Sequence, residues 1–367
     1  MLLINDLGRH SATFASDIHV AMRRVVDSGW YVLGPEVRAF EQELAAYCRM
    51  PYCVGVGNGT DALELGLRAL GVGPGDIVAT VANAGMYSSA AIASIGAIPR
   101  YVDVDESLTM SPAALEKVLG GRVRAVIVTH LYGRMASMPA ILHLCRAAGV
   151  PLVEDCAQAI GAEFDGTPAG AWGDVGCFSF YPTKNLGAIG DGGAMLARDE
   201  RVAERMRALR QYGWTRKYEA TIPAGRNSRL DELQSAVLRA KLPYLAGWNV
   251  RRRAIADRYH GAIRNDAVQL PPPSDPAYVA HLYVVRTAER DALRSHLSAA
   301  RIASEVHYPV PDYRQSALAG RAPSEELPAT EAACREVLSL PCFPEMSDKE
   351  VDTVAEAVNR WEPPCTP

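Results

Sequence analysis

The sequence predicts an α/β protein whose large domain carries a mostly parallel sheet, followed by a smaller α+β domain. Continuous Val/Ile-rich strand patterns alternate with helical patterns over the first part of the chain, as in a buried parallel sheet. The pattern changes after the Pro271-Pro272-Pro273 run, and 367 residues exceed one ordinary domain. We therefore expect a large domain over residues 1–245 and a small domain over residues 246–367.

Turn and capping residues indicate where the expected helices begin, end or divide. Asp17 can cap a helix that ends at Gly29, and Gly34-Pro35 opens the next helix. Pro243 is expected to kink or divide a long helical stretch. The expected helices span residues 18–27, 36–48, 62–70, 88–95, 139–148, 200–210, 231–263, 291–299, 330–338 and 347–361, with another from Pro112, and the expected strands span 52–56, 76–81, 97–104, 123–129, 150–153, 281–286 and 304–308.

Charge and cysteine usage argue against several classes of partner. The net charge is −4 and Lys and Arg are spread along the chain, so neither a nucleic acid nor an anionic membrane is the expected partner. No uncharged apolar run approaches the roughly 18 residues of a membrane span. The eight cysteines are scattered without a C-x-x-C pair, as in a reducing compartment. We expect a cytoplasmic protein without a metal site.

The segment from Phe178 to Ala194 presents one lysine between an aromatic, strand-forming run and a glycine-rich turn. Lys184 has few charged neighbours in sequence, whereas most lysines lie on solvated helix faces. Desolvation here would lower its pKa and favour the neutral amine, which is the form that condenses with an aldehyde. On this segment alone, a reactive lysine and a lysine beside an ordinary loop are equally good interpretations.

A second candidate segment, Gly57–Asp61, follows a strand and opens a helix. Its backbone N–H groups and the Thr60 hydroxyl can hold a phosphate at the helix N-terminus. The spacing Gly57-x-Gly59-x-x-Ala62 also fits a loose dinucleotide pattern, although no acidic residue ends a strand about 20 residues later. A plain strand-to-helix turn is the third interpretation.

A third candidate is Asp155, which an apolar strand carries to the sheet edge where ligands bind in open parallel sheets. Buried carboxylates need a cationic or hydrogen-bonding partner, and a protonated pyridine nitrogen would serve. Gln158, one turn later, can hydrogen-bond a phenolic oxygen on the same ligand. An Asp at a strand end can also simply cap the following turn.

Four segments in this order closely resemble the DegT/DnrJ/EryC1/StrS family of pyridoxal-phosphate-dependent nucleotide-sugar aminotransferases. They are residues 57–63, 154–162, 178–193 and 226–234, and the resemblance extends from Leu33 to about Pro344. It implies the PLP-dependent transferase fold of the aspartate aminotransferase type (type I), with large and small domains. It also implies a homodimer whose active sites are shared between the subunits.

The resemblance implies roles for individual residues. Lys184 matches the lysine that forms a Schiff base with pyridoxal 5'-phosphate (PLP), which cycles with pyridoxamine phosphate. Asp155 matches the partner of the cofactor's ring nitrogen, and Gln158 matches a residue against the ring and its phenolic oxygen. The implied phosphate contacts are Gly59, Thr60 and Ser179, together with Asn227 of the neighbouring subunit.

One departure from the family concerns the residue that stacks on the cofactor ring. Many members place an aromatic side chain where this chain has Gly85. Tyr87 is the expected stacking residue instead, and a tyrosine on a surface loop is the alternative.

The segment Glu305–Pro311 resembles the H-Y-P-x-P segment of members that aminate C-3 of a dTDP-linked 3-keto-6-deoxyhexose. It implies His307 and Tyr308 as substrate contacts, with Tyr181 as a further one. His307 could equally be a strand residue of the small-domain core. We expect L-glutamate as amino donor, so that a dTDP-3-amino-3,6-dideoxyhexose and 2-oxoglutarate are formed.

Other functions stay open at this point. A C-4 aminotransferase acting on a nucleotide-linked 4-keto-6-deoxyhexose is the nearest alternative. Sugar dehydratases of the same fold commonly carry His in place of the lysine, so Lys184 argues against them. An NAD-dependent oxidoreductase and a non-catalytic regulatory protein are alternatives from other classes.

Overall fold

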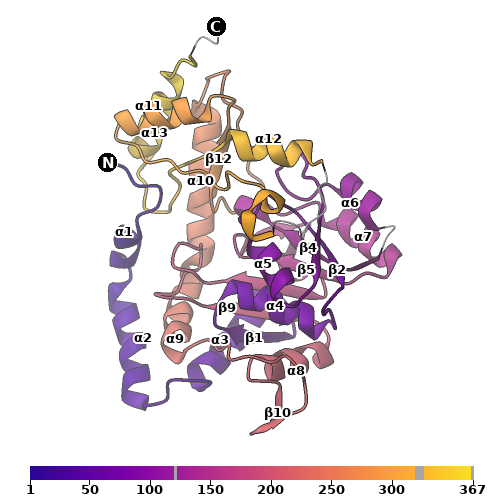
Figure 1. The fold of residues 1–367 in the computed structure, drawn as a ribbon. Coiled ribbons are helices and arrows are strands. Elements are labelled where there is room, and N and C mark those ends of the chain that lie inside the picture. The colour runs from indigo at the N-terminus through magenta and orange to yellow at the C-terminus, as the bar shows by residue number, and fades with distance from the viewer. Residues whose placement is uncertain (120–121, 319–325, 365–367) are drawn as a thin grey trace.

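The computed structural model describes residues 1–119, 122–318 and 326–364 and has a seven-stranded sheet at its centre (Figure 1). In spatial order, the strands are β1 (Tyr52–Val56), β9 (Gly193–Ala197), β8 (Val175–Ser179), β5 (Leu152–Asp155), β4 (Val123–Thr129), β2 (Ile77–Thr80) and β3 (Ile98–Tyr101). Pairing is parallel from β8 to β3, whereas β9 runs antiparallel to both of its neighbours. This architecture confirms the α/β class with a mostly parallel sheet.

The sheet is apolar on both faces, which explains the continuous hydrophobic runs in its strands. Along β4, Val126 and Val128 belong to one buried cluster, and Ala125 and Ile127 belong to a second cluster on the opposite face. Helices α4, α5 and α8 contribute to the second cluster and α3, α6 and α7 to the first. The helices of this part are α2 (Ala15–Ser28), α3 (Pro35–Tyr47), α4 (Gly59–Ala69), α5 (Tyr87–Ser94), α6 (Pro112–Leu119), α7 (Met138–Ala148), α8 (Glu200–Leu209), α9 (Glu232–Lys241) and α10 (Leu245–Ala262).

A third buried cluster lies in the C-terminal part, where β12 (Tyr283–Arg286) pairs antiparallel with β13 (Val337–Leu340). Helices α10, α11 (Arg290–Ala299) and α13 (Asp348–Asn359) contribute to it, and α12 (Pro328–Glu336) precedes β13. As expected, Pro243 interrupts the long helical stretch, because a 3-10 turn at Leu242–Tyr244 separates α9 from α10. The domain boundary at residue 245 stays a prediction.

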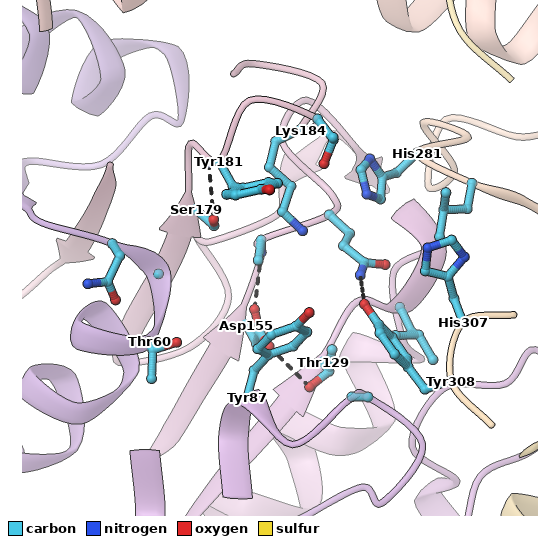
Figure 2. A pocket seen from close by; sticks show the side chains of 18 of the residues that line it. Thr60, Tyr87, Thr129, Asp155, Ser179, Tyr181, Lys184, His281, His307 and Tyr308 are labelled. Carbon is cyan, nitrogen blue, oxygen red and sulfur yellow. Dashed lines mark hydrogen bonds between the residues drawn. The ribbon is translucent and has the colours of Figure 1, made fainter. Parts of the chain in front are cut away.

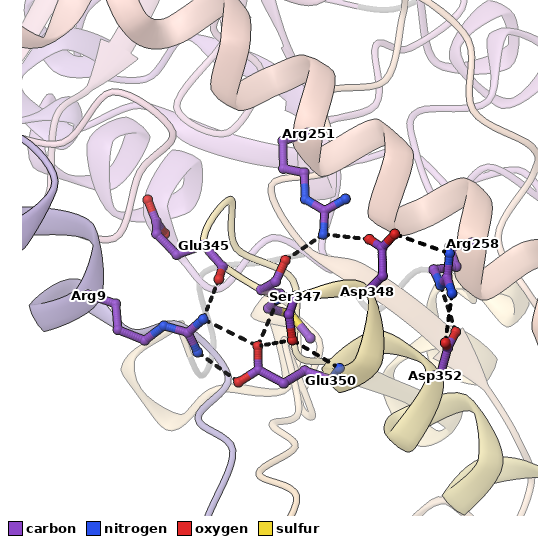
Figure 3. Close-up of polar contacts among 9 residues, drawn as sticks. Arg9, Arg251, Arg258, Glu345, Ser347, Asp348, Glu350 and Asp352 are labelled. Carbon is purple, nitrogen blue, oxygen red and sulfur yellow. Dashed lines mark hydrogen bonds and ion pairs between the residues drawn. The ribbon is translucent and has the colours of Figure 1, made fainter.

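The N-terminal helix α1 (Leu7–Ala12) is fastened to this C-terminal part by ion pairs (Figure 3). Arg9 contacts the Glu350 carboxylate at 2.8 Å and donates to the Glu345 carbonyl. Ser347 and Glu350 form a capping box at the start of α13, and Arg258 of α10 pairs with Asp352 at 2.6 Å. The first residues of the chain are thereby held near α13 and the segment before it.

Several sequence predictions differ from the structure. The strand expected over 304–308 is wrong: only Glu305 forms a single bridge, to Ser339, because Pro309 and Pro311 lack N–H donors for further pairing. The helix expected over 330–338 ends at Glu336, and the next residues form β13 instead. Asp17 lies in the first turn of α2 and is not its cap.

Other segments carry structure that the sequence did not predict. The loop over 211–225 contains a hairpin of β10 (Trp214–Arg216) and β11 (Glu219–Ala220), and a second hairpin joins β6 (Glu163–Phe164) to β7 (Thr167–Pro168). Within the described residues, no helix is long and apolar enough to cross a bilayer.

Candidate active site

A cavity of about 560 Å³ lies beyond the carboxyl ends of β4, β5 and β8, where Thr129, Asp155 and Ser179 end their strands. Helix α4 presents its N-terminus to the same cavity, and the segments around residues 281 and 307, from the C-terminal part of the chain, also line it. Figure 2 shows these side chains converging on one space. Its size suits a small-molecule ligand.

Lys184 follows β8 in a loop that is held by its own backbone. The Lys184 amide donates to the Tyr181 carbonyl at 2.8 Å, and the Ala188 amide donates to the Phe180 carbonyl at 2.8 Å. Only glycine fits at position 187, because a Cβ there would lie 2.4 Å from the Pro182 carbonyl oxygen. Burial lowers the pKa of Lys184 to about 8, and the nearby Asp155 charge opposes this shift. The amine is thus partly neutral near physiological pH.

Asp155 turns its carboxylate into the cavity with few partners. One oxygen accepts from the Ala157 amide at 3.1 Å and the other from the Thr129 hydroxyl at 3.4 Å. Burial raises the pKa of Asp155, and these hydrogen bonds and the Lys184 charge oppose the shift. A cationic ligand nitrogen in the cavity would therefore stabilise the ionised form.

Glu154, the neighbouring residue, points to the opposite face of β5 and is fully engaged there. Its carboxylate accepts from the amides of Gly170, Trp172 and Gly173 at 2.8–3.0 Å. His130 Nε2 lies 3.0 Å from the same carboxylate, and His130 Nδ1 accepts from the Ala136 amide, so Nε2–H is the donor. These contacts anchor the end of β5 and so fix the backbone that presents Asp155.

Hydrogen bonds orient the side-chain amide of Gln158. Its oxygen accepts from the Tyr132 amide at 2.6 Å, so its nitrogen faces the cavity side and donates to the Tyr308 hydroxyl at 3.2 Å. Gln158 therefore presents a donor toward the ligand space, as hydrogen bonding to a phenolic oxygen requires.

The Tyr308 ring occupies the space that Gly85 leaves open. A Cβ at position 85 would lie 2.7 Å from this ring, and the positive φ of +72° also favours glycine there. Tyr87 meets the Tyr308 ring edge-on at a centroid distance of 5.9 Å and lines the cavity with 47% of its surface exposed. An aromatic pair, Tyr87 and Tyr308, therefore lies beside Gly85 at the cavity.

The N-terminus of α4 is shaped for an anion. Asn58 caps the helix by accepting from the Asp61 amide at 2.8 Å, which leaves the first helical N–H groups, at Gly59 and Thr60, for a ligand. A Cβ on Gly59 would lie 2.7 Å from Ser179 Cβ, so only glycine lets the two segments approach this closely. Thr60 and Ser179 both line the cavity.

Asn227 does not line the cavity of its own chain, and the phosphate contact predicted for it is in the neighbouring subunit. It pairs with Gln211 in an isolated bridge, and the next residue, Ser228, donates to Asp61 at 2.6 Å. The segment is thus fixed on the start of α4 outside the cavity of its own chain. A role in the cavity of a second copy stays a prediction.

The predicted substrate residues His307, Tyr308 and Tyr181 all line the cavity. His307 Nδ1 lies 2.9 Å from the Ser339 hydroxyl, so its ring is held by β13 at the cavity wall. Sequence reasoning missed Asn5, Thr129 and His281, which line the same space. Thr129 could have been found, since it ends a predicted strand beside Asp155, but Asn5 and His281 come from distant segments without a local signal.

Comparison with known proteins gives consistent matches over nearly the whole chain. The model of the DegT/DnrJ/EryC1/StrS aminotransferase family matches residues 13–359. The dTDP-3-amino-3,4,6-trideoxy-alpha-D-glucose transaminase of Streptomyces venezuelae is 46% identical, covering 97% of this chain and 95% of the relative. The dTDP-3-amino-3,6-dideoxy-alpha-D-galactopyranose transaminase of Aneurinibacillus thermoaerophilus is 44% identical, covering 98% and 99%. The crystal structure of S. venezuelae DesV with a ketimine intermediate superposes with a TM-score of 0.94 at 44% identity, covering 98% of both chains.

Proposed function

The chain belongs to the DegT/DnrJ/EryC1/StrS aminotransferase family, and we propose that it transfers an amino group from L-glutamate to C-3 of a dTDP-linked 3-keto-6-deoxyhexose. The observation that carries this proposal is the cavity itself. It brings the Lys184 amine, the Asp155 carboxylate and the N-terminus of α4 together with the His307-Tyr308 segment.

Members of this family depend on PLP, and the cavity fits the three chemical needs of this cofactor. Lys184 offers an amine of lowered pKa for its aldehyde, and Asp155 lacks a cationic hydrogen-bond partner that a ring nitrogen could supply. The close contact of Gly59 with Ser179 shapes an anion site for its phosphate. When bound, PLP supplies an electron sink that stabilises negative charge on the carbon next to the transferred amino group.

The chain's own residues then have separate roles. The Lys184 amine would hold the cofactor by its aldehyde carbon and, once released, would move a proton from the carbon that carries the amino group to that former aldehyde carbon. Asp155 would keep the ring nitrogen protonated. The Gln158 amide nitrogen donates one hydrogen to the Tyr308 hydroxyl and would donate its second to the cofactor's phenolic oxygen. Tyr87 and Tyr308 form the wall of the cavity next to Gly85.

Two features support the sugar and its reacting carbon. Both transaminases named above carry 3-amino-dTDP-sugars in their names, and the chain spans nearly the full length of each. The His307-Tyr308 segment that resembles C-3 enzymes lines the cavity, with the hydroxyl of Tyr308 against Gln158. One feature departs from the C-3 enzymes: Asp312 stands near a position where they commonly carry histidine, and here it is buried and accepts from the Met86 amide and the Ser89 hydroxyl.

A homodimer with shared sites and a cytoplasmic location complete the proposal. The dimer is supported by Asn227, which is fixed outside its own cavity although it matches a phosphate contact from a neighbouring subunit. The location is supported by the described cysteines, all seven of which are free and buried.

The direct test is an incubation of the purified, PLP-loaded enzyme with L-glutamate and either a dTDP-3-keto- or a dTDP-4-keto-6-deoxyhexose. We expect NMR to locate the new amine on C-3 and to show equimolar 2-oxoglutarate. Amination of C-4 alone would overturn the C-3 assignment. In a parallel incubation with NADH in place of L-glutamate, reduction of the keto-sugar without amine formation would favour the oxidoreductase instead.

A further inference from the structure

Asp312 lies at the end of the segment that begins with His307, and its side chain holds the turn before α5. One carboxylate oxygen accepts from the Met86 amide at 3.0 Å, and the other accepts from the Ser89 hydroxyl at 2.5 Å. The Asp312 amide donates to the Ala82 carbonyl at 2.8 Å. Met86 precedes α5 and makes no side-chain cap of its own. Asp312 therefore caps α5 from a distant part of the chain.

The turn that Asp312 holds has a backbone that needs support. Gly85 and Met86 both have positive φ, at +72° and +71°. Residues with a Cβ rarely adopt this conformation, so Met86 keeps it only where other contacts hold it. The hydrogen bond to Asp312 is such a contact. Tyr87, the next residue, begins α5 and lines the cavity, so its position depends on this turn.

The segment from His307 to Asp312 is fixed at both ends. His307 Nδ1 lies 2.9 Å from the Ser339 hydroxyl of β13, and Asp312 is bonded to the start of α5. Two of the four residues between them are prolines, which restrict the backbone further. The Tyr308 ring lies so close to Gly85 that a Cβ there would be 2.7 Å from it. The segment thus contacts the turn before α5 at two points.

Asp312 is a buried carboxylate without a cation. It is 1% exposed, and none of the ion pairs between the described residues includes it. Burial raises its pKa to about 6, and the hydrogen bonds from Ser89 and Met86 oppose this shift. The carboxylate is therefore mostly ionised at neutral pH, so both of its oxygens accept. The N-terminus of α5 favours this negative charge.

A second carboxylate caps a helix in the same way but away from the cavity. Asp103, just after β3, accepts from the amide and the hydroxyl of Thr330 in α12, both at 2.8 Å. It also accepts from the Ala329 amide at 3.2 Å. Neither Asp103 nor any residue of α12 is among the described residues that line the cavity. Asp103 is therefore a matched control for the structural part of the role of Asp312.

We propose that Asp312 is a positioning residue for the aromatic wall formed by Tyr87 and Tyr308, which contacts a six-membered ring of the ligand. These two side chains lie together at the cavity, whereas Asp312 does not reach it (Figure 2). The inference deepens the proposed function and rests on it, because the ring belongs to the cofactor or to the keto-sugar. Aromatic side chains pack favourably on the faces of such rings, so a displaced wall weakens binding of the ring that it contacts.

Four variants separate positioning from simple loss of stability. Asp312→Ala removes both acceptor oxygens. Asp312→Asn keeps an acceptor for the Met86 amide and turns an amide donor toward the Ser89 hydroxyl, so it should act as the rescue. Asp103→Ala removes the cap of α12. Tyr87→Ala, alone and combined with Asp312→Ala, tests whether Asp312 acts through the wall.

Two readouts distinguish the cofactor ring from the sugar ring. The first is the rate of PLP release when the holoenzyme is diluted without sugar. The second is the KM for the keto-sugar that the parent aminates, at saturating L-glutamate. We expect Asp312→Ala to raise one of these quantities about fivefold, with kcat near the parent value. Asp312→Asn and Asp103→Ala should stay within about twofold, and so should the further effect of Asp312→Ala in Tyr87→Ala.

Parent-like values of both quantities in a folded Asp312→Ala would overturn the proposal. An equal effect of Asp103→Ala, or an undiminished effect of Asp312→Ala in Tyr87→Ala, would overturn it as well. Where Asp312→Ala does not fold, Ser89→Ala removes only one of the two hydrogen bonds and should raise the same quantity by a smaller factor; no change would then contradict the proposal. PLP release involves no sugar, so this result stands apart from the outcome of the C-3 test.

Discussion

Lys184 and Lys241 belong to two adjoining regions, the loop after β8 and the end of α9 that packs against it. Burial lowers the pKa of each to about 8. The Lys241 amine, however, donates to the Gly187 carbonyl at 2.6 Å and lies 5.2 Å from the centre of the Phe14 ring. Lys184 faces a cavity of about 560 Å³ with no such partner in the described chain.

The difference shows what makes a buried lysine reactive. A lowered pKa alone supplies a neutral amine, and both regions meet that condition. Only Lys184 also faces a cavity that can hold a ligand. Asp155 and the start of α4 line the same cavity and can bind the ring nitrogen and the phosphate of the cofactor. Lys241 instead supports the loop, since it contacts the glycine three residues after Lys184.

Replacing each lysine gives the largest expected contrast. Lys184→Ala should lower aminotransferase kcat by about 10⁴-fold or more, because it removes both the covalent attachment and the proton carrier. The matched variant Lys241→Met should keep kcat within a few-fold of the parent, as measured by 2-oxoglutarate release. A comparable loss in both variants would remove the distinction between the two regions.

Asp155 gives the next largest effect. Asp155→Asn should lower kcat by about 10³-fold, because an amide does not keep a ring nitrogen protonated. Its free energy of unfolding should change by less than about 1 kcal/mol, since burial already disfavours the charged carboxylate. Parallel turnover assays and urea unfolding of the cofactor-free protein measure both quantities. A variant that unfolds easily but turns over normally would contradict this assignment.

Glu154, one residue earlier, should show the reverse pattern. In Glu154→Gln, an amide nitrogen faces backbone N–H donors that contact a carboxylate oxygen in the parent protein. We expect a loss of about 2–3 kcal/mol in the free energy of unfolding and only a modest fall in kcat for the protein that remains folded. Unchanged stability would show that the end of β5 is anchored in another way.

Much of the site was predictable because its parts lie in short motifs at strand ends. Lys184, Asp155 and Thr60 each follow an apolar strand, and the topology of a parallel sheet brings such ends together. His281 was not predictable, because its partners Asn185 and Asn249 are far from it in sequence and meet only after folding.

The errors in the fold have a similar origin. Residues 304–308 alternate like a strand, but Tyr308 packs into the space at Gly85 and two prolines follow, so pairing stops after Glu305. Conversely, Val337–Leu340 continues a helical pattern and becomes a strand only because β12 lies beside it. In both segments tertiary contacts outweighed the local preference.

The smallest expected effect concerns stability at alkaline pH. Between pH 8 and 10.5 the unfolded chain binds a proton at Lys241 that the folded protein lacks, so this group adds stability as pH rises. Burial raises the pKa of several thiols, which lowers the stability of the folded protein as pH rises. The informative quantity is therefore the difference in the free energy of unfolding between the parent and Lys241→Met. From pH 8 to 9.5, the parent should gain up to about 1.4 kcal/mol per pH unit relative to the variant in urea unfolding. A constant difference would show that Lys241 stays charged when folded.

The most direct test of the central claim identifies which lysine bonds to the cofactor. The PLP-loaded protein is reduced with borohydride, digested, and analysed by peptide mass spectrometry. We expect a stoichiometric pyridoxyl group on Lys184 and none on Lys241. A pyridoxyl group on Lys241 or on another lysine, or unmodified Lys184 in protein that has bound PLP, would contradict the assignment of Lys184 as the reactive amine.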